Sequence, residues 1–157
     1  MNRQGAVGAL LDIYEQTISD LKNVIKDISD NDLTKILDKK TTNEDCRSIQ
    51  TILTHVVSSG YSYAISIHNY KENNVERPEK ILRLTIAEYL NDLTDVFAFT
   101  ENVFKEIKDD ELEQPVNSLK MQTSWGQCYD IEQITEHAIV HILRHKRQIE
   151  RMKRDKL

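Results

Sequence analysis

Apolar residues recur at three- and four-residue spacing along four stretches of the chain, with polar residues between them. This period is that of an α-helix with one buried side, because residues three and four apart share a face. We therefore predict four long amphipathic helices. They run from Val7 to Ile28, from near Thr42 to Ile67, from Thr85 to Ile107, and from Ile131 to about Lys153.

Polar residues with capping potential precede three of these stretches. A threonine three residues before an acid forms the capping-box pattern, in which the two side chains satisfy free N–H groups at a helix start. Thr42 with Asp45, and Thr85 with Glu88, have this spacing, and Asp130 stands directly before the last stretch. We expect the second, third and fourth helices to begin at these positions.

Three segments lack the helical period and are predicted to be connections. They comprise residues 29–44, with one helical turn near Leu33, residues 71–83, and residues 114–129. The second and third contain proline, which interrupts helices. Trp125 lies in the third connection, and we expect its large ring to plug into the end of the helical assembly.

Four such helices in 157 residues bury their apolar sides most simply as one all-α four-helix bundle, a single domain over residues 1–157. Four glycines and two prolines are too few for the many turns of an all-β protein.

The formal net charge of −5 argues against nucleic acid as a partner. A basic run over residues 144–156 falls near the end of the last helix, where cations interact favourably with the helix dipole. No apolar run approaches the ~20 residues of a membrane span, and the start lacks a secretory pattern. We expect a cytoplasmic protein without a membrane partner, in which Cys46 and Cys128 are free thiols.

Three of the five histidines, His137, His141 and His145, follow one another at four-residue spacing on the last predicted helix. Each step rises about 6 Å and turns about 40° past a full turn, so neighbours can reach one ion. His137 and His145 are about 12 Å apart along the axis, too far for both to lie about 2.1 Å from the same metal. At most two of the three are direct ligands, and His141 belongs to either possible pair.

A two-histidine site needs a ligand from another helix, and His55, within "TILTHVV", lies among inward-facing positions of the second helix. An unpartnered imidazole there would be unfavourable. His68 lies thirteen residues further on, turned away from that face, and is predicted to be solvated. The alternative is structural: histidines on a bundle face can hydrogen-bond carboxylates across helices without a metal.

The segments "LTHVV", "SWGQCYDIEQI" and "HILRHKRQI" resemble the DinB/YfiT-like superfamily, and the likeness spans nearly the whole chain. The resemblance implies a four-helix bundle in up-down-down-up order, often a homodimer. It also implies a divalent metal held by His55, His141 and His145, with Gln148 at the motif's glutamine. Two residues depart from the motif, because Lys146 stands for its arginine and Arg147 for its glycine, which puts a contact that used the glycine in doubt.

His137 is then predicted to line the pocket or support the ligands, with Glu136 and Glu132 as acceptors for imidazole N–H groups. Three neutral imidazoles leave coordination positions open, as catalytic sites do. Zinc suits this set best, and nickel, manganese and iron also bind imidazole. The general base stays open among Tyr61, Tyr63, Glu136 and His137.

Superfamily members with an assigned reaction resemble transferases and isomerases that use a low-molecular-weight thiol such as bacillithiol or mycothiol. The resemblance therefore implies a metal-dependent thiol S-transferase acting on a small molecule. Two alternatives remain: a metal-dependent hydrolase, which needs no thiol, and a non-catalytic bundle that binds a metal or ligand or dimerises.

Overall fold

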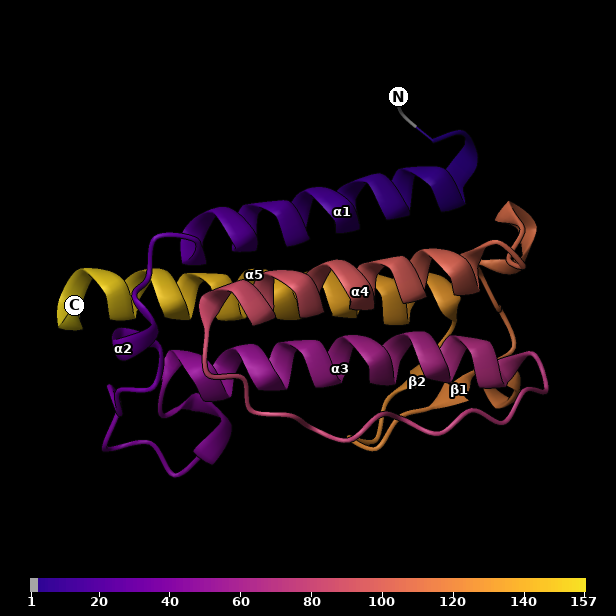
Figure 1. Ribbon diagram of the computed structural model, residues 1–157. Coiled ribbons are helices and arrows are strands. Elements are labelled where there is room, and N and C mark those ends of the chain that lie inside the picture. Colours follow the sequence, from indigo (N-terminus) through magenta and orange to yellow (C-terminus); the bar gives the residue numbers. More distant parts are fainter. Residues whose placement is uncertain (1–2) are drawn as a thin grey trace.

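Four long α-helices form a bundle in the computed structural model, which describes residues 3–157 without the side chain of Lys156. The predicted all-α four-helix bundle is confirmed (Figure 1). The long helices are α1 (Gly5–Ile25), α3 (Ile49–Tyr70), α4 (Ile86–Phe104) and α5 (Ile131–Lys156). The short elements are α2 (Asp30–Leu33), η1 (Glu44–Cys46), η2 (Asp109–Glu111), η3 (Asn117–Leu119), β1 (Met121–Gln122) and β2 (Cys128–Tyr129).

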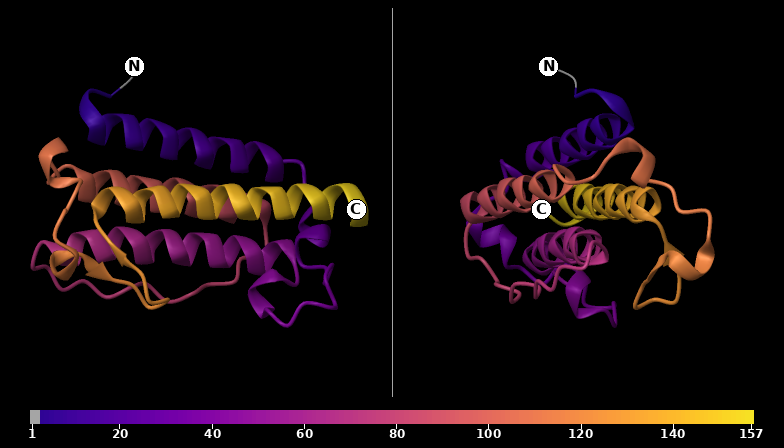
Figure 2. Two further views of the ribbon diagram at one scale, coloured as in Figure 1. Left: turned by 180° about the vertical axis from the view of Figure 1, so that it is seen from behind. Right: turned by 90° about the vertical axis from the view of Figure 1, so that its right-hand side faces the viewer.

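The helices follow the up-down-down-up order. In Figure 1, α3 and α4 run in one direction and α1 and α5 run in the other. Each helix packs against two neighbours, because α1 and α3 each contact both α4 and α5, an arrangement visible nearly end-on in Figure 2. Since α3 and α4 are parallel, residues 71–85 must return along the length of the bundle, which explains why this connection is long.

The apolar stripes predicted from the sequence meet in one continuous core. Burial of each large aliphatic side chain stabilises the fold by about 1.5–3 kcal/mol relative to leaving it exposed. Gly60 permits a close approach of α3 to α4, because a Cβ atom there would lie 2.9 Å from Val96 Cγ2. Residues with 0 % exposure come from every long helix and include Leu21, Ile25, Ile49, Ile52, Leu53, Tyr89, Leu93 and Ile149.

The predicted starts of the third and fourth helices are confirmed. Thr85 caps α4 in a capping box with Glu88, and Asp130 caps α5. The start predicted near Thr42 is wrong, because α3 begins at Ile49, where the Ser48 side chain accepts from Thr51 N. The intervening residues form the short turn η1 instead, which leaves its side chains free to point back at α3.

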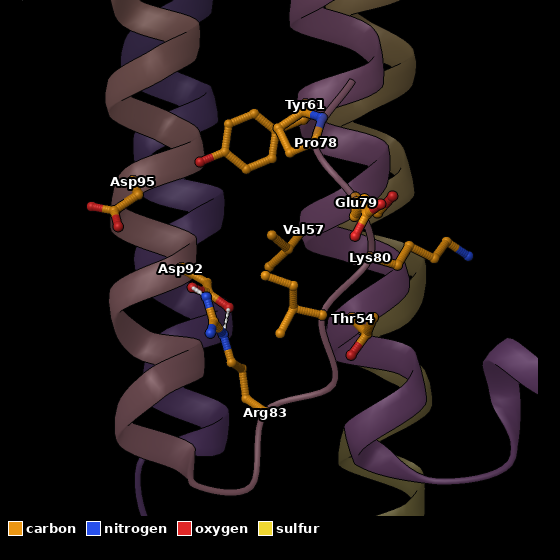
Figure 3. Close-up of a pocket in the computed structure, with 11 residues that line it drawn as sticks. Thr54, Val57, Tyr61, Pro78, Glu79, Lys80, Arg83, Asp92 and Asp95 are labelled. Carbon is orange, nitrogen blue, oxygen red and sulfur yellow. Dashed lines mark hydrogen bonds and ion pairs between the residues drawn. The ribbon is translucent and has the colours of Figure 1, made fainter. Parts of the chain in front are cut away.

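The connection over residues 71–85 is fixed to the bundle by polar contacts near its end. The hydroxyl of Tyr89, which is fully buried, accepts from Arg83 N (3.1 Å) and donates to the Gln50 carbonyl (3.0 Å). Arg83 also forms a two-pronged ion pair with Asp92 of α4, at 2.8 and 2.9 Å. Arg83 and Asp92 line a hollow of about 180 Å³ between α3, α4 and the connection, shown in Figure 3.

A small hairpin precedes α5 and corrects the expectation for Trp125. Strands β1 and β2 pair antiparallel, with Met121 opposite Tyr129, and the turn uses Gly126 at a φ of 92°. Glycine adopts this left-handed conformation without steric cost. Because the turn carries the indole outward, Trp125 does not plug into the bundle end; it is 45 % exposed and stacks on His137, with ring centroids 4.9 Å apart.

Among the helices of the described residues, none combines the length and the apolar character needed to cross a membrane.

Candidate metal centre

Three imidazoles meet between α3 and α5. Nε2 of His141 lies 3.0 Å from Nε2 of His55 and 3.2 Å from Nε2 of His145. The three residues each offer one ring nitrogen, and these nitrogens all lie within 4.8 Å of one another. We call His55, His141 and His145 the histidine cluster.

The helix geometry explains this meeting. His141 and His145 are one turn apart on α5, and His55 reaches them from the second turn of the neighbouring helix α3. His145 is only 4 % exposed, whereas His55 and His141 are partly exposed at the edge of the core. The cluster therefore lies where the α3–α5 interface opens to solvent.

The outer nitrogens of two cluster histidines contact acceptors. Nδ1 of His55 lies 3.1 Å from Asp45 Oδ2, and Nδ1 of His145 lies 3.0 Å from Gln148 Oε1. A neutral imidazole that donates through Nδ1 carries a lone pair on Nε2. Both contacts thus direct lone pairs toward the centre of the cluster, the arrangement by which supporting residues orient metal-bound histidines.

Burial and mutual repulsion keep the cluster uncharged. Burial lowers the pKa of His141 to about 3, helped by the neighbouring imidazoles and by Arg144. Burial also lowers the pKa of His55 and of His145, and it outweighs the opposing influence of Asp45 on His55 and of Gln148 on His145. Neutral imidazoles are the form that coordinates metal ions, so the cluster is ready to bind at neutral pH.

The donor set fits a divalent transition metal. Tetrahedral nitrogen ligands about 2.1 Å from zinc are spaced about 3.4 Å apart, close to the Nε2–Nε2 distances of 3.0 and 3.2 Å in the cluster. Among the described residues, no carboxylate or thiol joins the group. Three imidazoles leave at least one coordination position for a water or a substrate, which distinguishes catalytic from structural zinc sites.

The model of the DinB family matches residues 1–155 of the chain. The chain belongs to the DinB family. No curated protein matches it with significant similarity. The histidines, tryptophan segment and glutamine that carried the resemblance lie at or beside one site in this DinB protein.

An aromatic wall extends the site on the side of the hairpin, formed by His137, Trp125, Tyr63 and Tyr129. His137 stacks on Trp125 at an interplanar angle of 22°, and its ring centroid is 5.4 Å from that of Tyr63. Tyr63 in turn meets His141 edge-on at 5.7 Å. His137 is outside the histidine cluster, and its ring centroid lies 6.4 Å from that of His141.

Other residues singled out from the sequence lie elsewhere. Glu136 is exposed, and the hydrogen bonds and ion pairs of the described residues include none from Glu136 or Glu132 to an imidazole. His68 is half-buried near the end of α3 beside Asn73. Tyr61 lines the hollow of Figure 3 and packs against Phe99, away from the histidine cluster.

Sequence reasoning missed Asp45 as the partner of His55. Asp45 was assigned to a helix start, and its carboxylate instead reaches Nδ1 of His55 and accepts from Lys80 Nζ at 3.3 Å. Gln148 was identified only through the motif, and its amide now has a physical role at His145. The four-residue spacing of the histidines on α5 indicated a site and left two pairs open, and the family resemblance selected His141 and His145, whereas a loop carboxylate carries no such signal.

Proposed function

We propose that this DinB protein is a divalent-metal-dependent thiol S-transferase, with His55, His141 and His145 as ligands and zinc as the ion that suits them best. The observation that carries the proposal is the convergence of three Nε2 atoms on one point, with no carboxylate among them. A thiol or water coordinated to a divalent ion at such a site loses its proton near neutral pH.

The chain's own residues have distinct tasks in this proposal. Asp45 and Gln148 hold the His55 and His145 rings so that Nε2 faces the site. The wall of Trp125, His137 and Tyr63 offers an apolar surface for an electrophilic substrate and excludes water from one side. Burial raises the pKa of Tyr63 to about 12, so in the metal-free protein its hydroxyl is protonated at neutral pH.

Among the described residues, the histidine cluster includes no carboxylate, which argues against hydrolysis of the glutamate-assisted kind. Metal-dependent hydrolases of the zinc protease type use a glutamate base beside the ion. A metal-coordinated thiol is deprotonated by coordination alone and needs no such base. The low-molecular-weight thiol is therefore proposed as the nucleophile and a small electrophile as the second substrate. The thiol sulfur would bond to the electrophilic carbon as the bond from that carbon to its leaving group breaks, and the thiol proton would pass to solvent.

The test measures metal content and turnover together. Wild type and His141→Ala are analysed by elemental mass spectrometry and assayed with a chromogenic aryl halide, with and without an added low-molecular-weight thiol. We expect about one metal per chain in wild type, its loss in the variant, and turnover only with thiol. Turnover of an ester without thiol would establish the hydrolase instead, and bound metal without any turnover would establish a non-catalytic bundle.

We further propose that the protein is a homodimer that works in the cytosol, where its free thiols Cys46 and Cys128 stay reduced. Large apolar side chains remain exposed on separate elements, among them Ile13 (55 %), Leu84 (70 %) and Val140 (59 %). A second copy that covered such groups would remove apolar surface from water. Light scattering coupled to size-exclusion chromatography should give a mass twice that of the 18.3 kDa chain. A mass equal to that of one chain would refute the dimer.

A further inference from the structure

Three arginines of α5 face one hollow of about 430 Å³ beside the histidine cluster. Arg144, Arg147 and Arg151 form one of its walls, and the connection before α3 forms the other through Thr41, Asn43 and Cys46. Gln148, which accepts from His145, also lines the space. We call it the arginine hollow; its volume is within the range of about 300–1,000 Å³ typical of small-molecule sites.

These three arginines differ from other cations of the same basic run. Lys146 pairs with Glu150, Lys153 with Asp27, and Arg154 with Asp155. By contrast, the guanidinium groups of the arginine hollow have no ion pair or hydrogen bond among the described residues. All three side chains are exposed, so their guanidinium groups are accessible to a ligand from solution.

The helix dipole, which the sequence suggested as the explanation, does not account for them. α5 extends to Lys156, so Arg147 lies more than two turns before the helix end and Arg144 more than three. The favourable effect of a cation on the dipole is confined to the last turn. Like charges at three- and four-residue spacing instead repel each other, a cost that a bound anion would offset.

The opposite wall supplies further hydrogen-bond donors. Thr41 Oγ1 accepts from Asn43 N at 3.2 Å, and Asn43 Oδ1 accepts from Asp45 N at 3.0 Å. Gln148 Oε1 accepts from His145 Nδ1. The hydroxyl hydrogen of Thr41 and the NH₂ groups of Asn43 and Gln148 therefore remain as donors, and no carboxylate among the described residues lines the hollow.

The spacing of the three arginines along α5 indicates how many acidic groups the ligand carries. Arg144 and Arg147 are about 4.5 Å apart along the helix, and Arg147 and Arg151 about 6 Å. At these intervals two neighbouring guanidinium groups can engage one acidic group, and guanidinium binds carboxylate and phosphate through paired hydrogen bonds. At the Arg151 end, a neighbouring hollow includes Asp38 and Asp155, which limits the anionic site to the side toward the histidine cluster.

We propose that the arginine hollow binds a small anion with two acidic groups, of carboxylate or phosphate type. Because Gln148 lines the hollow and also contacts His145, the bound anion lies next to the histidine cluster. The site does not require a metal ion and is independent of the thiol-transfer proposal. It is a binding surface for a charged part of a substrate or for a separate anionic effector.

Calorimetric titration tests the site with two probes, inorganic phosphate and succinate, at constant ionic strength maintained with chloride. Arg147→Gln and Arg151→Gln remove one guanidinium each, and Arg154→Gln is the matched control because it removes a paired arginine of the same helix. We expect wild type and the control to bind at least one probe equally. The two hollow variants should bind it roughly tenfold more weakly or not at all.

Alkylation by neutral iodoacetamide locates the anion. Cys46 lines the hollow, whereas Cys128 is exposed on the hairpin and serves as an internal control. The probe should slow alkylation of Cys46 in wild type, leave Cys128 unaffected, and give no protection in Arg147→Gln. Succinate binding without phosphate binding would assign carboxylate chemistry to the site, and the converse would assign phosphate chemistry.

The His141→Ala variant and metal analysis separate the two proposals. Anion binding that survives in metal-free His141→Ala supports the arginine hollow, whether or not wild type holds a metal. Three results would overturn the proposed anion site: no binding of either probe, equal binding by wild type and Arg147→Gln, or binding that disappears only in His141→Ala. The last would place the anion on the metal ion.

Discussion

The carboxylate of Asp45 lies 3.1 Å from Nδ1 of His55, although Asp45 belongs to the short turn before α3 and His55 to the helix itself. A carboxylate behind a metal-binding imidazole fixes the ring and raises the basicity of the opposite nitrogen. We predict that Asp45→Ala lowers zinc affinity by about 10- to 100-fold. Competition with a chromogenic chelator measures this change.

Glu44→Ala is the matched control, because Glu44 belongs to the same turn, is exposed, and pairs only with Arg47 among the described residues. Its zinc affinity should equal that of wild type. Equal affinities for Asp45→Ala and Glu44→Ala would show that the carboxylate does not support the site.

Gln148 offers an independent test of ring orientation. Gln148→Ala removes the acceptor at His145 Nδ1 and should weaken zinc binding by about tenfold or more. Gln148→Glu keeps an acceptor at the same position and should retain affinity close to that of wild type. If both variants lose affinity alike, the amide serves packing rather than orientation of the imidazole.

Stability of the metal-free protein should fall in mild acid. The pKa of each cluster histidine is lowered in the folded state, so below about pH 6.5 the unfolded chain takes up protons that the folded chain does not. The contribution of neutral His141 to the free energy of unfolding is complete above pH 6.5. It is lost progressively as the pH falls toward the folded-state pKa of His141, about 3. The slope is at most about 1.4 kcal/mol per pH unit for each histidine.

Urea unfolding at several pH values measures this slope. His141→Ala should show a shallower decline in the free energy of unfolding than wild type between pH 6.5 and 5. Parallel curves for wild type and His141→Ala would contradict the burial of an uncharged imidazole at this position.

The stacked pair of Trp125 and His137 predicts an effect on substrate rather than on metal. Trp125→Ala should leave the zinc content unchanged and raise KM for an apolar electrophile roughly three- to tenfold, the value of one aromatic contact. Trp125→Phe retains an aromatic face and should lie between wild type and the alanine variant. A change of kcat with constant KM in steady-state assays would argue against a binding role.

Tyr89 tests how the connection over residues 71–85 is fixed. Tyr89→Phe leaves the Arg83 N–H without its acceptor and should lower the free energy of unfolding by about 1–3 kcal/mol. Tyr61→Phe is the control, because the Tyr61 hydroxyl has no hydrogen bond among the described residues, and it should change stability by less than about 0.5 kcal/mol. Urea denaturation monitored by circular dichroism distinguishes the two.

The four helices were predictable because each buries one apolar stripe, and a stripe is a property of sequence alone. The meeting of His141 and His145 followed from their spacing on one helix, whereas the approach of His55 depends on how α3 packs against α5. The start of α3 was misplaced because Thr42 and Asp45 have capping-box spacing in a segment where Ser48 forms the real cap. The spacing of residues within a loop therefore does not determine which side chain caps the following helix, because tertiary contacts decide this.

The same limit applies to Trp125, whose position depends on the hairpin. Two-residue strands carry too short a pattern to be distinguished from an irregular loop. The tryptophan was expected to seek burial because of its size, and it instead lies half-exposed over His137.

A metal ion bound at the histidine cluster would have a second consequence, on the folding of the chain. His55 and His141 are separated by 86 residues, so an ion held by both closes a ring that contains α4 and both long connections. Closing a long loop restricts the unfolded chain more than closing a short one. A bound ion would thus act as a reversible cross-link between α3 and α5, and the stability of the fold would depend on the concentration of available metal. The metal-free chain would then be the form more readily cleaved by proteases.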